Sequence, residues 1–207
     1  MDRITRRYQF YREHKYVSFA LNDLERLVAK TDFRVPSQVE KIEQEFNAIV
    51  QLLQAHAHYE DTKLHSLLQK KGSSVFQEAE KDHQHQEAAF QSLHQLLEQI
   101  KATQDIELGY QFYLQFRKFV GDNLHHLHVE ETQILPELQR LYTDDELRTV
   151  EAETYKEMTV EELIEMIQVL FPHFNPSDKE AFLIDIRDAA PDKFTRVWET
   201  INMEHLV

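Results

Sequence analysis

The chain contains no cysteine and very little glycine or proline. With Cys at 0 in 207 residues, disulfides, thiolate zinc sites, iron–sulfur clusters and cysteine nucleophiles are excluded. Gly at 3 and Pro at 5 argue against collagen, flexible linkers and turn-rich β sandwiches, and favour long helices. Basic residues are also outnumbered, because 23 Lys and Arg face 37 Asp and Glu, giving a net charge of −14. Such an acidic surface repels phosphate, so we expect neither nucleic acid nor a membrane as a partner.

Long apolar runs are missing as well. The first residues, 1–15, have no apolar stretch of the kind found in signal peptides, and no run in the chain is long enough to span a membrane. We therefore expect a cytoplasmic protein. The composition, 42% hydrophobic and 29% charged, is that of a globular domain. Histidine stands out at 12 residues, most of them in three clusters at 56–65, 83–94 and 125–128.

Four long segments carry apolar residues at the three- and four-residue spacing of amphipathic helices. They span about residues 7–30, 37–70, 74–101 and 106–142. Because the links between them are short, neighbouring helices should run antiparallel. The predicted fold class is therefore all-α, with an antiparallel up-down-up-down four-helix bundle over residues 1–142.

The remaining residues, 143–207, predict a C-terminal appendage of short helices. Capping-box patterns begin at Thr143, Thr159 and Ser177, each with Glu three residues later. Aromatic residues in this segment should bury it against the bundle or against a partner, so a homodimer formed through the appendage is one expectation.

Polar residues occupy positions on the apolar stripes where the helical period calls for core residues. Burying a carboxylate costs several kcal/mol unless it is paired or binds a metal, and no Lys or Arg shares these stripes near that level. A cation is therefore the simplest counter-charge. The stripe residues are His14, His56, Glu60, His83, His126 and Glu130. Most other histidines, His65 among them, fall off the stripes and are expected at the surface.

The spacing of these residues also favours a shared metal site. His56–Glu60 and His126–Glu130 are each four residues apart, which puts both side chains on one helix face. Each pair can offer an imidazole to one metal and a carboxylate that bridges two. Counting residues from each turn places the histidines of all four helices within about 3–8 Å of a common level. Nitrogen and oxygen donors without thiolate suit iron, zinc or manganese.

The set formed by His14, HAHYE (56–60), DHQHQE (82–87) and HLHVEETQILP (126–136) resembles the hemerythrin family, in its HHE cation-binding branch. The resemblance covers about residues 7–142 and implies two iron ions with an oxo or hydroxo bridge. It also implies that the four histidines His14, His56, His83 and His126 are terminal ligands, and that Glu60 and Glu130 bridge the irons. Oxygen carriers of the family have a second histidine where this chain has Glu87, which we include among the candidate ligands. His85 and Glu80 remain alternatives for completing the ligand set of the third helix.

The resemblance implies a non-haem di-iron protein that binds O₂ or a related small oxidant, for oxygen binding, storage or sensing, with no enzymatic step required. One alternative is a di-iron oxidase, or a protein that handles peroxide, NO or iron. The ferritin-like oxidases use two Glu-x-x-His motifs, and only Glu80-x-x-His83 is well placed here. Another alternative is a metal-free helical interaction module.

Overall fold

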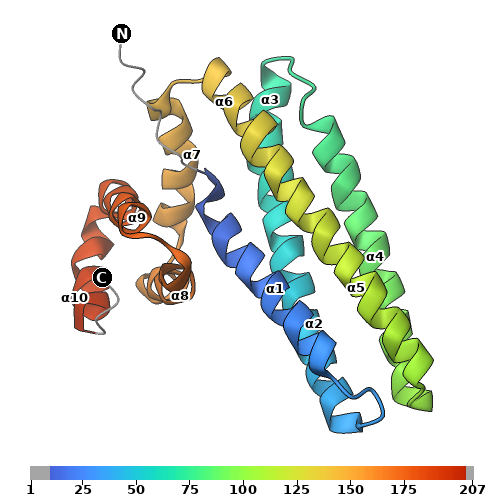
Figure 1. Cartoon of the computed structure of the whole chain (residues 1–207). Helices are drawn as coiled ribbons and strands as arrows, with labels where there is room; N and C mark the ends of the chain where they lie inside the picture. The colour runs from blue at the N-terminus through green and yellow to red at the C-terminus, as the bar shows by residue number, and fades with distance from the viewer. Residues whose placement is uncertain (1–9, 204–207) are drawn as a thin grey trace. The chain divides into compact units, whose positions relative to one another are not determined.

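Figure 1 shows the computed structural model of the chain, which describes residues 10–203. These residues contain helices and no strand, so the predicted all-helical class is confirmed. The α-helices are α1 (His14–Lys30), α2 (Pro36–Tyr59), α3 (His65–Lys70), α4 (Gln77–Thr103), α5 (Ile106–Val129), α6 (Leu135–Leu141), α7 (Asp144–Glu157), α8 (Val160–Leu170), α9 (Pro176–Ala189) and α10 (Pro191–Met203). Short 3₁₀ turns η1 (Phe10–Glu13) and η4 (Phe171–His173) and the π-helical turns η2 (Glu60–Leu64) and η3 (Glu130–Ile134) complete the structure.

The chain forms two compact units. One, which we call the bundle unit, is Val17–Leu138. The other, the terminal unit, combines the described residues up to Tyr16 with those from Gln139 onward. The sequence predicts a boundary after residue 142; the two units divide between Leu138 and Gln139, and the segment just before Val17 groups with the C-terminal helices.

The bundle unit is built around an aromatic core. Its long helices lie alongside one another in Figure 1, and six phenylalanines form the centre of the buried cluster. These are Phe33, Phe46, Phe90, Phe112, Phe116 and Phe119. Phe33, in the turn after α1, packs so closely on Gly109 of α5 that a Cβ there would lie 2.6 Å from its ring. Glycine at 109 therefore allows this turn to seat on the first turns of α5.

Two π turns interrupt the long helices and change their buried face. In η2 the His65 N–H donates to the Glu60 carbonyl oxygen, five residues back, and in η3 Leu135 bonds Glu130 in the same way. Each π turn adds a residue to one turn, so the helix after it is rotated relative to the 3.6-residue pattern. Continued at the 3.6-residue period, the apolar stripe of α2 would include Leu67; the structure instead buries Leu68 and leaves Leu67 half-buried.

The helix starts of the terminal unit agree in part with the capping patterns. Thr143 and Thr159 each form the full capping box, with Glu146 and Glu162. The box expected at Ser177 is absent, because Asn175 is the N-cap and its side chain accepts from the Asp178 N–H. Pro176 then occupies the first helical position, where its missing N–H is harmless.

A buried arginine joins the two ends of the chain within the terminal unit. Arg12 is 2% exposed, and its Nη2 lies 2.7 Å from Asp185 Oδ2 and 3.5 Å from Glu151 Oε2. The Phe182 ring lies 5.2 Å from its guanidinium carbon. Burial acts to lower the pKa of Arg12, but the negative charge of Glu151 and the bond to Asp185 outweigh it and raise that pKa. The guanidinium is therefore held as a charged anchor for the segment that leads into α1.

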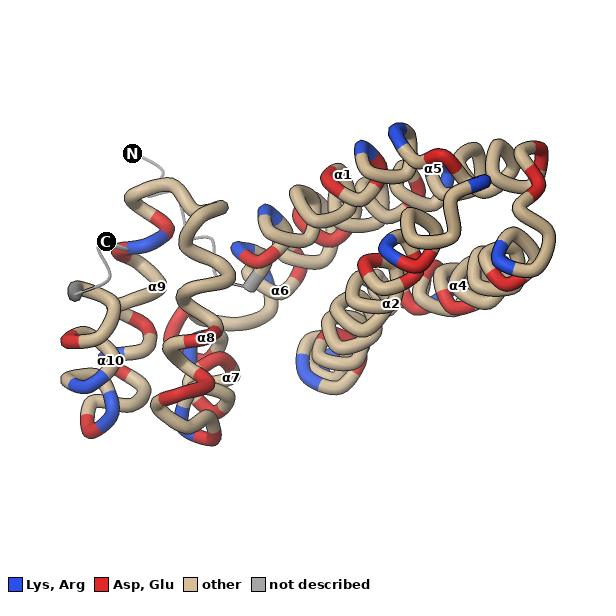
Figure 2. The backbone as a smooth tube through the Cα atoms, turned by 90° about the horizontal axis from the view of Figure 1, so that it is seen from below, with Lys and Arg blue, Asp and Glu red and all other residues tan. Residues whose placement is uncertain are grey.

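Asp and Glu recur along the helices of both units, with fewer Lys and Arg between them (Figure 2). This distribution matches the acidic composition. Among the described residues, no helix has both the length and the apolar character that crossing a membrane requires.

Candidate metal centre

The candidate ligands lie where the two π turns begin. His56 is in the last turn of α2 and Glu60 opens η2, while His126 is in the last turn of α5 and Glu130 opens η3. The same arrangement thus occurs on two helices: a histidine in the last α-helical turn is followed by a glutamate that opens a π turn. A π turn within an α-helix frequently marks a functional site, and here each one starts at a buried carboxylate.

One group of side chains joins Glu60, His83, His126 and Glu130. Their ligand atoms all lie within 4.8 Å of one another. His83 Nε2 is 3.0 Å from His126 Nε2 and 3.4 Å from Glu60 Oε2. His126 Nε2 is 3.2 Å from Glu130 Oε1. Neighbouring ligands at right angles on one metal, with bonds near 2.1 Å, would be separated by about 3 Å, so these spacings suit a common ion.

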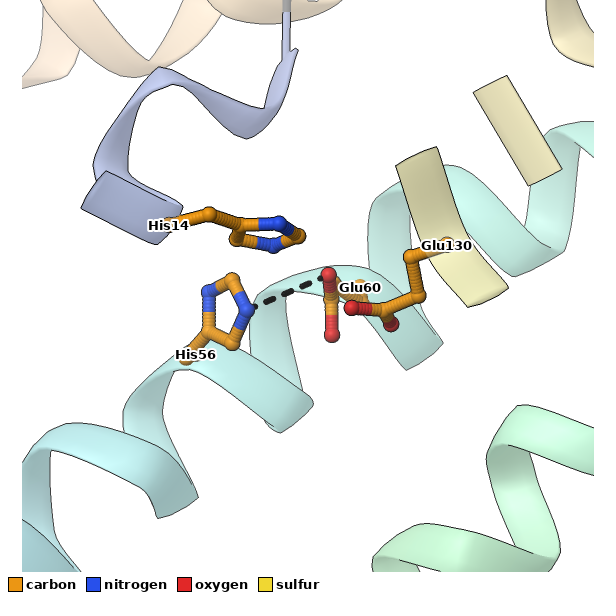
Figure 3. A group of neighbouring side chains, drawn as sticks. All are labelled: His14, His56, Glu60 and Glu130. Carbon is orange, nitrogen blue, oxygen red and sulfur yellow. Dashed lines mark ion pairs between the residues drawn. The ribbon is translucent and has the colours of Figure 1, made fainter. Parts of the chain in front are cut away.

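A second group joins His14, His56, Glu60 and Glu130 (Figure 3), again with ligand atoms within 4.8 Å of one another. His56 Nε2 lies 3.3 Å from Glu60 Oε1. His14 begins α1, the helix that continues without a break into the bundle unit. The two groups share the same two carboxylates, Glu60 and Glu130. A pair of ions, each with its own histidines and with both carboxylates between them, fits this arrangement.

The shared carboxylates are deeply buried, since Glu60 is 1% and Glu130 0% exposed. Imidazole nitrogens of His56, His83 and His126 lie 3.2–3.4 Å from their oxygens. Burying two carboxylates at one point is unfavourable unless positive charge neutralises them. The donor set is made of nitrogen and oxygen only, which fits iron, zinc or manganese, so the residues present fit the metal that the sequence predicts.

Carboxylates outside this set orient two of the histidines. His83 Nδ1 donates to Asp61 Oδ1 at 3.0 Å, and His126 Nδ1 lies 3.5 Å from Asp82 Oδ2. A carboxylate on Nδ1 fixes the tautomer in which Nε2 carries the lone pair that binds a metal. Sequence reasoning missed the role of Asp61 and Asp82. Each stands next to a predicted ligand, at Glu60 and His83, and that adjacency is the only sequence signal for it.

The pKa values of the facing imidazoles of His83 and His126 are shifted in opposite directions. Burial, followed by the neighbouring His126, lowers the pKa of His83. Burial also acts to lower the pKa of His126, but its bond to Glu130 and the charges of Glu130 and Asp82 raise it instead. Without metal, these shifts favour a proton on His126 over one on His83. A metal ion that binds both Nε2 atoms must displace this proton.

Glu87 does not join either group. Its side chain is exposed and accepts a hydrogen bond from Gln54 Nε2 at 3.0 Å. The buried face of α4 runs through Gln86 and Phe90 beyond His83, so a residue four positions after His83 is turned toward solvent. His85 is exposed as well. Neither Glu87 nor His85 therefore belongs to the candidate ligands that surround Glu60 and Glu130.

His65 was expected at the surface, and that prediction is wrong. It is 1% exposed, stacks on Phe76 and lies nearly parallel to the His83 ring. The π turn between Glu60 and Leu64 is the cause, because its extra residue rotates position 65 into the interior. Burial lowers the pKa of His65, which favours its neutral form.

The family model of the hemerythrin HHE cation binding domain matches residues 5–138. The chain belongs to this family. The match covers the bundle unit and both groups of ligand atoms, and it confirms the resemblance seen in the sequence motifs. Neither the comparison with curated proteins nor the comparison with solved structures gave a match. Membership of the HHE family supports the binding of metal cations by these histidine and glutamate side chains.

Proposed function

We propose that this HHE protein holds a pair of non-haem iron ions and binds O₂ or a related small oxidant at that pair. The observation that carries the proposal is the sharing of Glu60 and Glu130 by two groups of ligand atoms. Two separate mononuclear sites would not need common carboxylates. The short links from α1 to α2, from α3 to α4 and from α4 to α5 support the antiparallel up-down-up-down bundle as the scaffold.

Each residue has a distinct role in this proposal. His14 and His56 would hold one ion, His83 and His126 the other, and Glu60 and Glu130 would bridge them. When bound, the metal pair supplies the open coordination position and the electrons that oxidant binding requires. Asp61 and Asp82 keep the rings of His83 and His126 in the ligating tautomer.

The surroundings of the centre restrict water. Leu64 and Ile134, at the ends of the two π turns, are 1% and 0% exposed, and Tyr11 stacks on His14 with ring centroids 4.5 Å apart. An apolar surround raises the strength of every electrostatic contact within it and limits side reactions with water. This environment suits the binding of a small apolar molecule such as O₂.

The alternative functions fit less well. A ferritin-like oxidase would draw on a second Glu-x-x-His motif, and Glu80 of the single candidate lies outside both groups that share Glu60 and Glu130. A metal-free interaction module leaves the burial of those two carboxylates unexplained. The geometry therefore favours an oxidant-binding centre over both.

Elemental analysis of the purified protein tests the proposal directly. We expect about two irons per chain, with near-ultraviolet absorption from bridged ferric iron. The reduced protein is then exposed to O₂ and deoxygenated again under optical monitoring. A spectral change that reverses supports oxygen binding, whereas irreversible oxidation with O₂ consumption supports the oxidase alternative. Folded protein that takes up no iron when supplied with ferrous salt would refute the di-iron proposal.

A further inference from the structure

A third group of potential ligands lies on the bundle unit beside the shared carboxylates. It consists of Asp61 in η2, His65 at the start of α3 and Glu80 on α4, and their ligand atoms lie within 4.8 Å of one another. His65 Nδ1 is 2.9 Å from Asp61 Oδ1 and 3.9 Å from Glu80 Oε1. These separations fall in the range of about 3–4 Å expected between ligands of one transition-metal ion with bonds near 2.1 Å.

The buried imidazole is the second observation that points to a ligand. His65 is 1% exposed, and its Nδ1 is aimed at the two carboxylates. Within the described part of the chain, neither of its ring nitrogens makes an aligned hydrogen bond, although Asp61 is close. A buried polar group without such a bond is costly, and a cation between the imidazole and the carboxylates would satisfy it.

We propose that Asp61, His65 and Glu80 form a third cation site for a divalent first-row transition metal ion. One imidazole and two carboxylates give the mixed nitrogen and oxygen donors that Fe²⁺, Zn²⁺ and Mn²⁺ accept. The side chains of Asp61 and Glu80 are 41% and 42% exposed, so the site opens to solvent on its carboxylate side. It therefore binds and exchanges metal more readily than the buried pair.

Asp61 connects this site to the proposed iron pair. Its Oδ1 accepts from His83 Nδ1 and also lies 2.9 Å from His65 Nδ1, so the same carboxylate faces both imidazoles. An ion here would withdraw negative charge from the carboxylate that orients His83. The site goes beyond the proposed di-iron function, because it would take up metal whether or not the pair is iron.

The experiment is a calorimetric titration of the purified, iron-loaded protein with Zn²⁺, with iron content measured before and after. Glu80→Gln is the main variant, because Glu80 is partly exposed and its replacement keeps the side-chain shape. Glu78→Gln, the same substitution at an exposed position on the same helix, is the matched control. His65→Asn is a second variant, with its thermal melting recorded to show that it remains folded.

We expect wild type to bind about one Zn²⁺ without losing iron, and Glu80→Gln and His65→Asn to bind it at least about tenfold more weakly. Tenfold is the lower end of the affinity lost when a supporting residue of a metal site is removed. Glu78→Gln should behave like wild type. Equal Zn²⁺ affinity in wild type and Glu80→Gln would overturn the proposal. Loss of iron in Glu80→Gln would overturn it too, because it would assign Glu80 to the pair.

The same titration keeps this proposal separate from the di-iron proposal. If the chain takes up no iron pair, the purified wild type and Glu80→Gln proteins both lack iron. The weaker Zn²⁺ binding of Glu80→Gln relative to wild type would persist. If only the third site is wrong, both proteins keep their iron and the difference vanishes.

Discussion

Replacing Glu130 by glutamine should weaken metal binding and strengthen the metal-free fold at the same time. Glu130 belongs to both groups of ligand atoms and is fully buried. Glutamine has nearly the same shape but no charge, so it removes a bridging ligand without creating a cavity. We expect Glu130→Gln to bind substantially less iron than wild type.

The expected gain in the metal-free protein follows from the cost of burying a charge. Replacing a buried ionised group by a neutral one of similar volume should raise the free energy of unfolding by about 1–3 kcal/mol when no strong partner is lost. One partner is His126, which can release its proton, so its imidazole need not remain as a buried positive charge. For a chain of this length, that gain corresponds to a melting temperature about 2–12 °C higher. The gain should be larger at pH 8 than at pH 6, because His126 is more often neutral at the higher pH.

Thermal melting followed by circular dichroism, with and without ferrous iron, measures both effects. Glu131→Gln is the control, since it makes the same change one residue along, at an exposed position. The control should bind iron and melt like wild type in both states. Metal-free Glu130→Gln that melts below metal-free wild type, or that retains the full iron content, would refute the reasoning.

Three further predictions concern the terminal unit, the π turn and pH. Arg12→Ala removes a buried cation that contacts the carboxylates of Glu151 and Asp185, so we expect the free energy of unfolding in denaturant to fall by about 3–5 kcal/mol; a loss below about 1 kcal/mol would contradict the anchoring role. Leu68→Ala should cost about 2–5 kcal/mol, and Leu67→Ala clearly less, because the π turn buries Leu68; the opposite order would contradict that register. Finally, Zn²⁺ affinity measured by equilibrium dialysis should fall as the pH is lowered from 8 to 6. The fall should reach up to about tenfold per pH unit for each proton that the metal displaces on binding. The raised pKa of His126 makes proton competition begin at a higher pH than for an ordinary histidine, and a flat profile would contradict it.

The sequence predicted the residues on the regular parts of the helices well. The 3.6-residue period holds along α2 as far as Glu60 and along α5 as far as Glu130, so the stripes placed His56 and His126 inside. The four-residue spacing to each glutamate then kept the carboxylates on the same face. Up to these points local periodicity alone decides which side chains are buried.

Beyond the two glutamates, periodicity is a poor guide. A π turn is set by backbone hydrogen bonds over five residues, and it leaves no clear mark on the pattern of apolar residues. His65 was misplaced for this reason. Glu87 was assigned by analogy with a family motif, whereas the buried face of α4 passes through Gln86. The carboxylates that orient the ligand rings depend on contacts between helices, which a single sequence does not contain.

The ion cluster around Arg12 has a practical consequence for anyone who wishes to study the helical bundle alone. A shortened protein that stops at residue 142 would keep the guanidinium and discard both acids that neutralise it. Only one residue separates Arg12 from His14 along the chain. A disturbed Arg12 would therefore destabilise the start of α1 and leave the His14 imidazole less firmly positioned. Trimming the C-terminal helices therefore also changes the surroundings of the candidate ligand His14, and Arg12 should be replaced by a neutral residue in the same step.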